Sequence, residues 1–313
     1  MADASSAAAW RGYWREDRLS ACMPDDAGAN AAIEQHWRSL FEAVEPGARV
    51  LDVATGNGVL LLWASEVAPV DATLIGVDLA DIDPQRFLSS HGDSLRAVQF
   101  LGNTPAEALP FDDGSFDLLV SQYGLEYAEL GAALAESARV LCSGGELHWL
   151  AHSADSAVAA QGRRQLRELT LLLDPEGPFT AMRAFLEAQR SAAAVKRATR
   201  RLTEALRRAQ DYCERHPEAA LLRQLCGGIL DTANNLPRYH PDDVDHWLED
   251  NRRRLKAQRQ RMLDLQRARL DEARLEQLRA LLGMAPWREF SCELLRGGGQ
   301  DAELGIVIHA RRA

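Results

Sequence analysis

The sequence predicts an α/β fold in which a mostly parallel β-sheet with helices on both faces is interrupted by a large helical insert. A short apolar strand passes through a glycine turn into an apolar helix at residues 49–66. Strand-like and helix-like runs then alternate as far as residue 151, as they do in parallel sheets joined by crossover helices. A long segment rich in Ala, Leu and Arg follows, and two strand-like runs come last.

The first 45 residues predict a helical cap. Helical patterns run over residues 7–14 and 29–44. Trp10, Tyr13 and Trp14 have the spacing i, i+3, i+4 and therefore share one helix face. We expect this aromatic face to pack on the core.

The alternating region predicts five strands and three helices. Ligands of parallel α/β sheets bind at the carboxyl ends of the strands, where the strand order reverses, so the loops after these strands are the expected site. The expected strands are 49–53, 73–78, 97–101, 117–122 and 146–151, and the expected helices are 59–66, 84–88 and 130–141.

The segment after His152 has a helical composition almost throughout. Pro, Gly and Asn clusters indicate breaks at residues 174–178, 216–217, 227–228 and 234–237. From His240 a helical pattern runs to Leu282, with acidic residues in its first turn. The sequence therefore predicts an all-α insert.

Two strand-like runs follow the insert. They span residues 287–295 and 304–310, and three consecutive glycines lie between them. Two strands joined by a short glycine loop are typical of an antiparallel hairpin. We expect this hairpin at the edge of the sheet, preceded by a last core helix at about 271–282.

Composition excludes several classes of protein. The 313 residues carry a net charge of −10, and 46% are hydrophobic, as in ordinary globular domains. The five cysteines are scattered, without a C-x-x-C pair, so we expect neither disulfides nor a metal site. No signal peptide and no membrane-spanning run is indicated. We expect a cytoplasmic protein without membrane contact.

The charge is unevenly distributed along the chain. Residues 155–282 hold 24 Lys and Arg against 19 Asp and Glu, whereas the remainder holds 12 against 27. The favoured interpretation is a set of solvated helix faces, and contact with an acidic partner is left open as an alternative.

Four motifs occur in order along the chain. They are VLDVATGNGVL at 50–60, a strand ending in an acid at 72–79, AEALPFDDGSFD at 106–117 and ARVLCSGGELHWL at 138–150. In this order they resemble the class I S-adenosylmethionine (SAM)-dependent methyltransferases, most closely the group with an ALPF-x-D-x-SFD loop and an RVL-x-x-GG turn. The resemblance covers about residues 46–153 and returns near the C-terminus.

The resemblance implies an architecture. The core would be a Rossmann-like sheet of seven strands, with an antiparallel last strand, formed by residues 46–153 and 268–313. Residues 1–45 would cap the SAM pocket. Residues 154–267 would form a substrate lid or an oligomerisation region, and the long helices offer a possible homodimer contact.

The resemblance also implies a cofactor, SAM, which would leave as S-adenosylhomocysteine. Gly56 and Gly58 would let its methionine part approach the backbone, with Asp52 near its amino group. Asp78, followed by Leu79, would hold the ribose hydroxyls, an assignment that a carboxylate at the end of a second strand also supports.

Further cofactor contacts are implied for Ala106 and Glu107 at the adenine and for Gln122 near the methionine moiety. Two departures from the family pattern stand out. Ala54 replaces a frequent glycine and would also contact the cofactor; we expect this change to be mild because alanine tolerates ordinary φ values. Pro105 replaces a common aspartate, which puts the adenine contact in doubt.

Methyl transfer is an in-line displacement in which the protein positions the nucleophile and in some cases removes its proton. Five groups near the strand ends are available as a base. His152 and Tyr123 are the candidates that we name as catalytic, although a lone histidine is more often a pocket wall. The available groups are Tyr123, Glu126, Tyr127, His148 and His152.

Other functions compete with a methyltransferase that acts on a small-molecule O, N or C acceptor. A nicotinamide-binding protein would have the motif G-x-G-x-x-G. This chain has Leu61 in place of the third glycine of that motif. An RNA, DNA or protein methyltransferase would use the Arg-rich insert, but nucleic acid is disfavoured by the net negative charge. A non-catalytic SAM-binding interaction protein is the third alternative.

Overall fold

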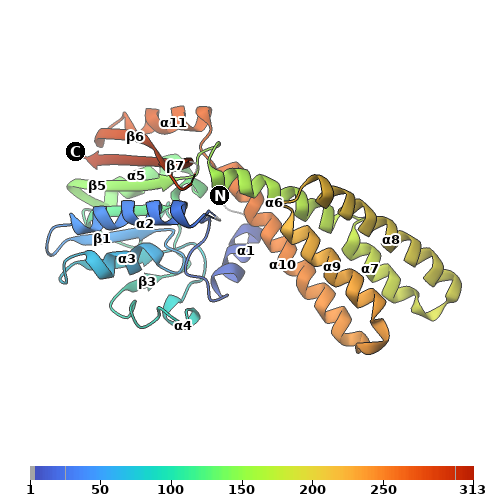
Figure 1. The fold of residues 1–313 in the computed structure, drawn as a ribbon. Helices are drawn as coiled ribbons and strands as arrows, with labels where there is room; N and C mark the ends of the chain where they lie inside the picture. The colour runs from blue at the N-terminus through green and yellow to red at the C-terminus, as the bar shows by residue number, and fades with distance from the viewer. Residues whose placement is uncertain (1–3, 25, 300) are drawn as a thin grey trace. The chain divides into compact units, whose positions relative to one another are not determined.

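The computed structural model describes residues 4–24, 26–299 and 301–313 (Figure 1). The chain divides into two compact units, which are described separately. Unit 1 comprises residues 1–161 and 264–313, and unit 2 comprises residues 162–263. Helices α6 (Ala157–Leu173) and α10 (Pro241–Ala268) each contain residues of both units.

Unit 1 is built on a seven-stranded sheet in the order β3-β2-β1-β4-β5-β7-β6. Strands β1 to β5 are parallel to one another, and β7 is antiparallel to both β5 and β6. The predicted mostly parallel sheet with an antiparallel last strand is confirmed. The strands are β1 (Arg49–Val53), β2 (Thr73–Val77), β3 (Gln99–Leu101), β4 (Phe116–Gln122), β5 (Leu141–Ala151), β6 (Trp287–Gly297) and β7 (Ala302–Arg312).

Two hydrophobic clusters cover the two faces of the sheet. Successive side chains of a strand point to opposite faces, so Val50 of β1 packs with α2 and α3, whereas Leu51 packs with α5 and α11. Figure 1 shows α2 and α3 in front of the strands. The helices of unit 1 are α1 (Ala4–Trp14), α2 (Ala27–Glu42), α3 (Val59–Val67), α4 (Pro84–Phe87), η1 (Leu125–Tyr127), α5 (Leu130–Val140) and α11 (Glu272–Leu282).

Helix α2 anchors the N-terminal region to the sheet. Ala29, Ile33, Trp37 and Phe41 recur every four residues and are at most 2% exposed, which gives the helix one apolar stripe. Asp26 caps its N-terminus by accepting a hydrogen bond of 2.7 Å from the Ala29 backbone nitrogen. The apolar stripe fixes Trp37 in the core, and this residue contacts Gln122, as described below.

Strand β5 is longer than predicted. We expected it to begin at Glu146, whereas it begins at Leu141, directly after α5. Its first part pairs Leu141 with Phe116, and the register shifts before Leu118 pairs with Glu146. Gly144, with a φ of +80°, takes a conformation that glycine adopts without strain, so the Gly-Gly pair makes an irregularity within the strand.

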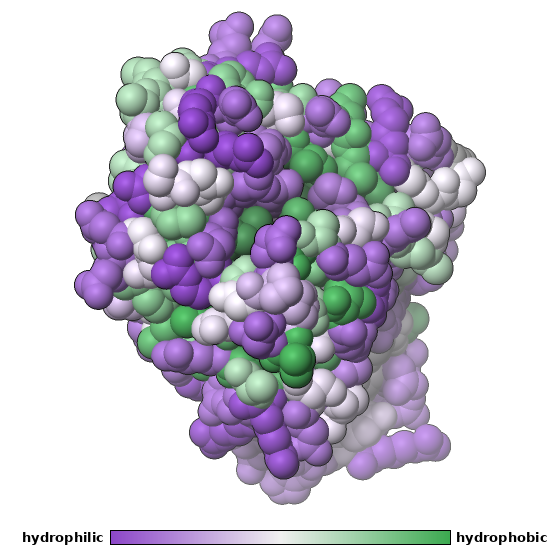
Figure 2. Space-filling model, turned by 90° about the vertical axis from the view of Figure 1, so that its left-hand side faces the viewer, coloured by the Kyte–Doolittle hydropathy of each residue, from purple (hydrophilic) through white to green (hydrophobic). Residues whose placement is uncertain are grey.

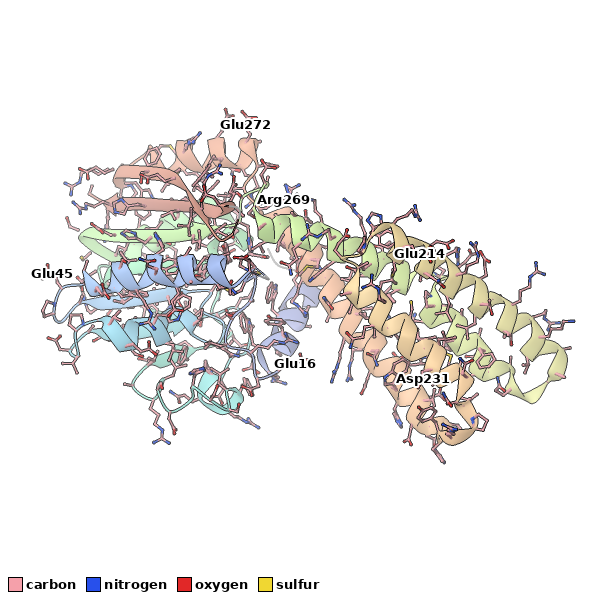
Figure 3. The ribbon with its side chains drawn as sticks, in the orientation of Figure 1. Glu16, Glu45, Glu214, Asp231, Arg269 and Glu272 are labelled. Atoms are coloured by element: carbon pink, nitrogen blue, oxygen red, sulfur yellow. The ribbon has the colours of Figure 1, made fainter. Side chains whose placement is uncertain are left out.

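Unit 2 is helical. Its own core contains Leu169, Met182, Leu202, Leu222 and Leu248, each at most 5% exposed. Figure 3 labels Glu214 and Asp231, two exposed residues of this unit. In addition to parts of α6 and α10, unit 2 contains α7 (Pro178–Glu187), η2 (Ala188–Arg190), α8 (Ala192–Arg215), α9 (Ala220–Asn234) and η3 (Leu236–Arg238).

Two predicted boundaries in the helical region differ from the structure. The predicted break at Gly227-Gly228 is wrong, because both glycines lie inside α9. Packing of Leu222 and Ile229 in the core of unit 2 outweighs the modest helix penalty of glycine. The long pattern from His240 to Leu282 divides at residues 269–271, where Asp271 caps α11 through a 3.1 Å bond from the Arg274 backbone nitrogen.

No helix among the described residues is long and apolar enough to cross a bilayer. Hydrophilic residues predominate on the face drawn in Figure 2, and hydrophobic residues occur there in small groups between them.

Candidate functional site

A cavity of about 400 Å³ lies in unit 1 at the carboxyl ends of β1, β2 and β4. This position is the switch point of the sheet, because the chain order reverses between β1 and β4. The volume falls in the range of about 300–1,000 Å³ that is typical of small-molecule sites. Helix α1 forms part of its wall through Ser6, Ala7, Trp10 and Trp14.

The structure brings six of the nine predicted cofactor residues to this cavity. They come from four separate segments of the chain, which the order of the strands in the sheet brings together. The six are Ala54, Asp78, Leu79, Ala106, Glu107 and Gln122. Asp52, Gly56 and Gly58 are buried nearby but do not line it.

Asp78 follows β2 and is 8% exposed. Its carboxylate accepts hydrogen bonds from the backbone nitrogens of Gly56, at 2.8 Å, and Ala80, at 2.7 Å. Burial raises the pKa of Asp78 to about 6, against the opposing effect of these two bonds. The carboxylate is thus oriented by the glycine loop on one side and by its own strand end on the other.

Ala54 has a φ of +60°, and Tyr123 has a φ of +52°. The expectation that Ala54 tolerates its position through an ordinary φ is therefore wrong, since an L-residue in the left-handed region costs about 1–2 kcal/mol. Both strained residues line the cavity. Backbone strain of this kind is concentrated at functional sites in proteins.

The open side of Gly56 is filled by an indole ring. A Cβ at this position, where φ is +55°, would come within 2.4 Å of the Trp14 ring. Asn57 fixes this arrangement, because its side-chain nitrogen donates to the carbonyl oxygens of Trp14, at 2.8 Å, and Arg18, at 2.7 Å. The N-terminal segment is thereby fastened to the glycine loop.

Gly58 serves a similar packing role. Its φ is +81°, and a Cβ there would meet the Phe100 ring at 2.7 Å. Both glycines of the motif are thus required by aromatic rings of this chain. A role of Gly56 and Gly58 in holding a cofactor stays a prediction.

Asp52 is 1% exposed and accepts a 2.6 Å hydrogen bond from the Thr55 hydroxyl through Oδ2. Its Oδ1 is buried and has no hydrogen-bond partner among the described residues. Burial raises the pKa of Asp52 to about 8, and the nearby Asp78 contributes in the same direction. A buried carboxyl with one unsatisfied oxygen fits a site that receives a polar ligand group.

The raised pKa of Asp52 predicts a pH-dependent stability. Between about pH 4 and pH 8 the folded chain binds more protons here than the unfolded chain, so folding weakens as the pH rises. Asp52→Asn does not titrate. Relative to this variant, the wild type should lose a few kcal/mol of unfolding free energy between pH 5 and pH 8, at about 1.4 kcal/mol per pKa unit. Urea denaturation at both pH values measures this; parallel changes in the two proteins would contradict it.

Gln122 ends β4 and is held from two sides. Its Oε1 accepts a 2.6 Å hydrogen bond from Nε1 of Trp37, and its Nε2 lies 3.7 Å from the sulfur of Met23. Trp37 is fully buried in α2. The amide is therefore fixed at the cavity wall by the helix that precedes the glycine motif.

The two residues predicted as catalytic stack on each other. Tyr123 and His152 have ring centroids 4.3 Å apart and an interplanar angle of 5°. Tyr123 lines the cavity, but its hydroxyl donates a hydrogen bond of 2.9 Å to the carbonyl oxygen of Leu304. His152 is fully buried, does not line the cavity, and has a pKa lowered to about 3 by burial. Its catalytic role stays a prediction.

Residues 51–149 match the family described as a methyltransferase domain, type 11. Apart from residues 50 and 150, this match covers the four motifs found in the sequence. Residues 51–149 therefore have the sequence of a methyltransferase domain.

Named relatives agree with this assignment. The chain is 40% identical over 102 residues to a demethylmenaquinone methyltransferase of Thermus thermophilus, covering 32% of this chain and 44% of that protein. It is 28% identical over 158 residues to a ubiquinone/menaquinone biosynthesis C-methyltransferase of Geobacter sp., covering 49% of this chain and 67% of that protein. The matches thus span about half to two thirds of these relatives.

Among solved structures, the chain is similar to a possible exported protein from Bordetella parapertussis, with a TM-score of 0.42 and 15% identity. That similarity covers 90% of this chain and 68% of the other.

The methyltransferase domain has a further acid at its cavity. Glu126 is 1% exposed, lines the cavity, and has a pKa raised to about 7 by burial. Its Oε2 accepts from Nε1 of Trp149 at 3.0 Å, and its Oε1 accepts from the backbone nitrogen of His152 at 2.8 Å. In the sequence Glu126 is only one of five available groups, because its burial depends on β5 and α11.

Residues far along the chain complete this end of the domain's cavity. Asp264, Arg267, Ala268 and Arg274 line it. A guanidinium nitrogen of Arg274 donates to the backbone oxygen of Glu126 at 2.9 Å. No local signal in the sequence links these residues to the glycine motif, since they are joined only by the fold.

Proposed function

We propose that this protein transfers a methyl group from SAM to a small-molecule acceptor. The observation that carries the proposal is the cavity at the switch point, which unites Asp78, Gln122 and the loop after β3 within a methyltransferase domain. SAM supplies a methyl group on a positively charged sulfur that a nucleophile displaces.

The residues present fit such a cofactor. The cavity volume is that of a small-molecule site. Asp78 offers ionisable oxygens for hydroxyl donors, and Asp52 has a buried oxygen without a partner among the described residues. We propose that Asp78 and Leu79 hold the ribose side, that Ala106 and Glu107 lie at the base, and that Gln122 lies at the amino-acid side.

Helix α1 would keep water away from the reaction. Trp10 and Trp14 are stacked with ring centroids 6.1 Å apart, and both line the cavity. Asn57 holds the end of this helix against the glycine loop. A closed, low-dielectric site strengthens the electrostatic contacts on which displacement at a sulfonium depends.

Glu126 would accept a proton from the acceptor. Its pKa near 7 lets it exist as a carboxylate at neutral pH and still take up a proton, which is the range that suits a general base. Two hydrogen bonds fix its orientation. We propose this role for Glu126 in preference to His152, which does not line the cavity.

The acceptor we propose is a small molecule with an aromatic or quinone-like ring. Trp10, Trp14, Tyr123 and Tyr127 provide aromatic surface in the cavity, and two relatives are named for methylation in menaquinone or ubiquinone biosynthesis. In the insert, Arg183, Arg207, Arg208 and Arg253 each form ion pairs with acidic residues. This pairing reduces the charge available for phosphate contact, so a nucleic-acid acceptor is not proposed.

Calorimetric titration with S-adenosylhomocysteine, followed by transfer of radiolabelled methyl groups to a panel of quinols, phenols and amines, tests the proposal. We expect one bound molecule per chain and label in at least one aromatic acceptor. Failure to bind the cofactor product would contradict the whole proposal. Binding without transfer to any member of the panel would favour the non-catalytic alternative.

A further inference from the structure

Two histidines and a glutamate meet on one face of the sheet in unit 1. In the antiparallel pair of β5 and β7, His148 lies opposite His309, and Glu146 lies opposite Arg311. All four point to the same face as Leu150, because every second residue of a strand does so. That face is covered in part by α2.

The three potential ligand atoms are close together. Nε2 of His148 lies 3.1 Å from Oε2 of Glu146, and Nε2 of His309 lies 3.5 Å from the same oxygen. All three atoms are within 4.8 Å of one another. Zinc binds nitrogen and oxygen at about 2.0–2.2 Å in a tetrahedron, which places neighbouring ligand atoms about 3.3 Å apart. The observed separations approach that geometry.

The surroundings support an ion at this point. Arg311 binds Oε1 of Glu146 through Nε at 3.1 Å and also through a terminal nitrogen, so Oε2 is the oxygen turned toward the imidazoles. Such outer partners orient metal-binding carboxylates. The side chains of His148, His309 and Glu146 are 17%, 29% and 29% exposed, which leaves a path for an ion.

A third imidazole lies nearby on α2. His36 is close enough to His148 for its charge to act on it. Nε2 of His36 is buried and has no hydrogen-bond partner within the described part of the chain. His36 is not one of the three groups whose ligand atoms lie within 4.8 Å of one another, so it is not counted among the ligands.

We propose that Glu146, His148 and His309 bind a divalent transition metal ion of the zinc class and thereby tie β7 to β5. None of the three lines the cavity, so the site is separate from the proposed methyl transfer and does not depend on it. The ion would act as a structural clamp between the last strand and the parallel sheet.

Zinc titration of the full chain in competition with a chromophoric chelator tests this site. The protein is first treated with a strong chelator, which is then removed. We expect one zinc ion per chain and a rise in the thermal unfolding temperature when zinc is added, since a ligand that binds only the folded state stabilises it. His148→Ala and His309→Ala should each weaken binding by more than about 10-fold, because loss of a ligand costs at least as much as loss of an outer partner.

Controls separate this site from adventitious binding. His240→Ala removes an exposed histidine that lies 3.6 Å from Asp242 and should leave zinc affinity unchanged. Glu146→Gln keeps the size of the side chain and should also weaken binding. A cobalt-substituted sample should lack thiolate absorption, which excludes the cysteines. Absence of stoichiometric zinc, or equal affinity in the two histidine variants and the wild type, would overturn the proposal.

Discussion

Replacing Glu126 with glutamine should lower the rate constant for methyl transfer by about 100-fold to 10,000-fold, the usual contribution of a general base. The carboxylate lines the cavity and has a pKa of about 7, whereas an amide cannot accept a proton at this pH. The rate constant of the wild type should rise with pH through about 7, as Glu126 ionises. This rise should be absent from the variant, which single-turnover rates between pH 5.5 and pH 8.5 would show.

A structural role of Glu126 predicts a different result. Glutamine would direct an NH₂ group toward either Trp149 Nε1 or the backbone nitrogen of His152, which costs about 1–3 kcal/mol of stability. Glu136→Gln is the matched control, because Glu136 also accepts a backbone hydrogen bond, from Leu109 at 2.7 Å, but does not line the cavity. It should lose stability and keep its rate constant. An unchanged rate constant in Glu126→Gln would rule out the base.

Asp78→Ala should weaken the affinity for SAM by about 1–3 kcal/mol, or about 5-fold to 150-fold, through loss of charge-assisted hydrogen bonds. Burial holds the pKa of Asp78 at about 6. Below that pH the carboxyl is protonated and its capacity to accept from hydroxyl groups falls, so the affinity of the wild type should decrease as the pH drops from 7 to 5. Calorimetry at the two pH values measures both effects.

Asp71→Ala is the control for this variant. Asp71 is an exposed aspartate that precedes β2, at the end of the strand opposite to Asp78, and its loss should leave the affinity unchanged. Asp78→Asn should bind with an affinity that depends less on pH in this range than that of the wild type. Equal affinity of Asp78→Ala and the wild type would remove Asp78 from the ribose assignment.

The sequence predicted the sheet well because its strands are local patterns. The strand at Arg49–Val53 and the acid after β2 each follow from fewer than ten neighbouring residues, and order along the chain places their ends at one edge of the sheet. The start of β5 was placed too late because its first residues pair only through an irregular register with β4. Gly227 and Gly228 were misassigned because packing in unit 2 overrides their local preference.

The parts of the site that escaped prediction depend on contacts between distant residues. Trp14 covers Gly56 only once α1 is fastened by Asn57. The raised pKa of Glu126 arises from burial, which the strand end at Trp149 helps to provide. His148 and His309 meet because β7 inserts between β5 and β6, an arrangement that no spacing of residues along the chain indicates.

The amide of Asn57 has a practical bearing on how the protein is prepared. Its two acceptors are the carbonyl oxygens of Trp14 and Arg18. A protein that starts after residue 20 would lack both acceptors, so the buried amide of Asn57 would lose both hydrogen bonds and the glycine turn would be exposed to solvent. Cofactor binding should therefore be assayed with protein whose first 20 residues have been shown by mass spectrometry to be intact.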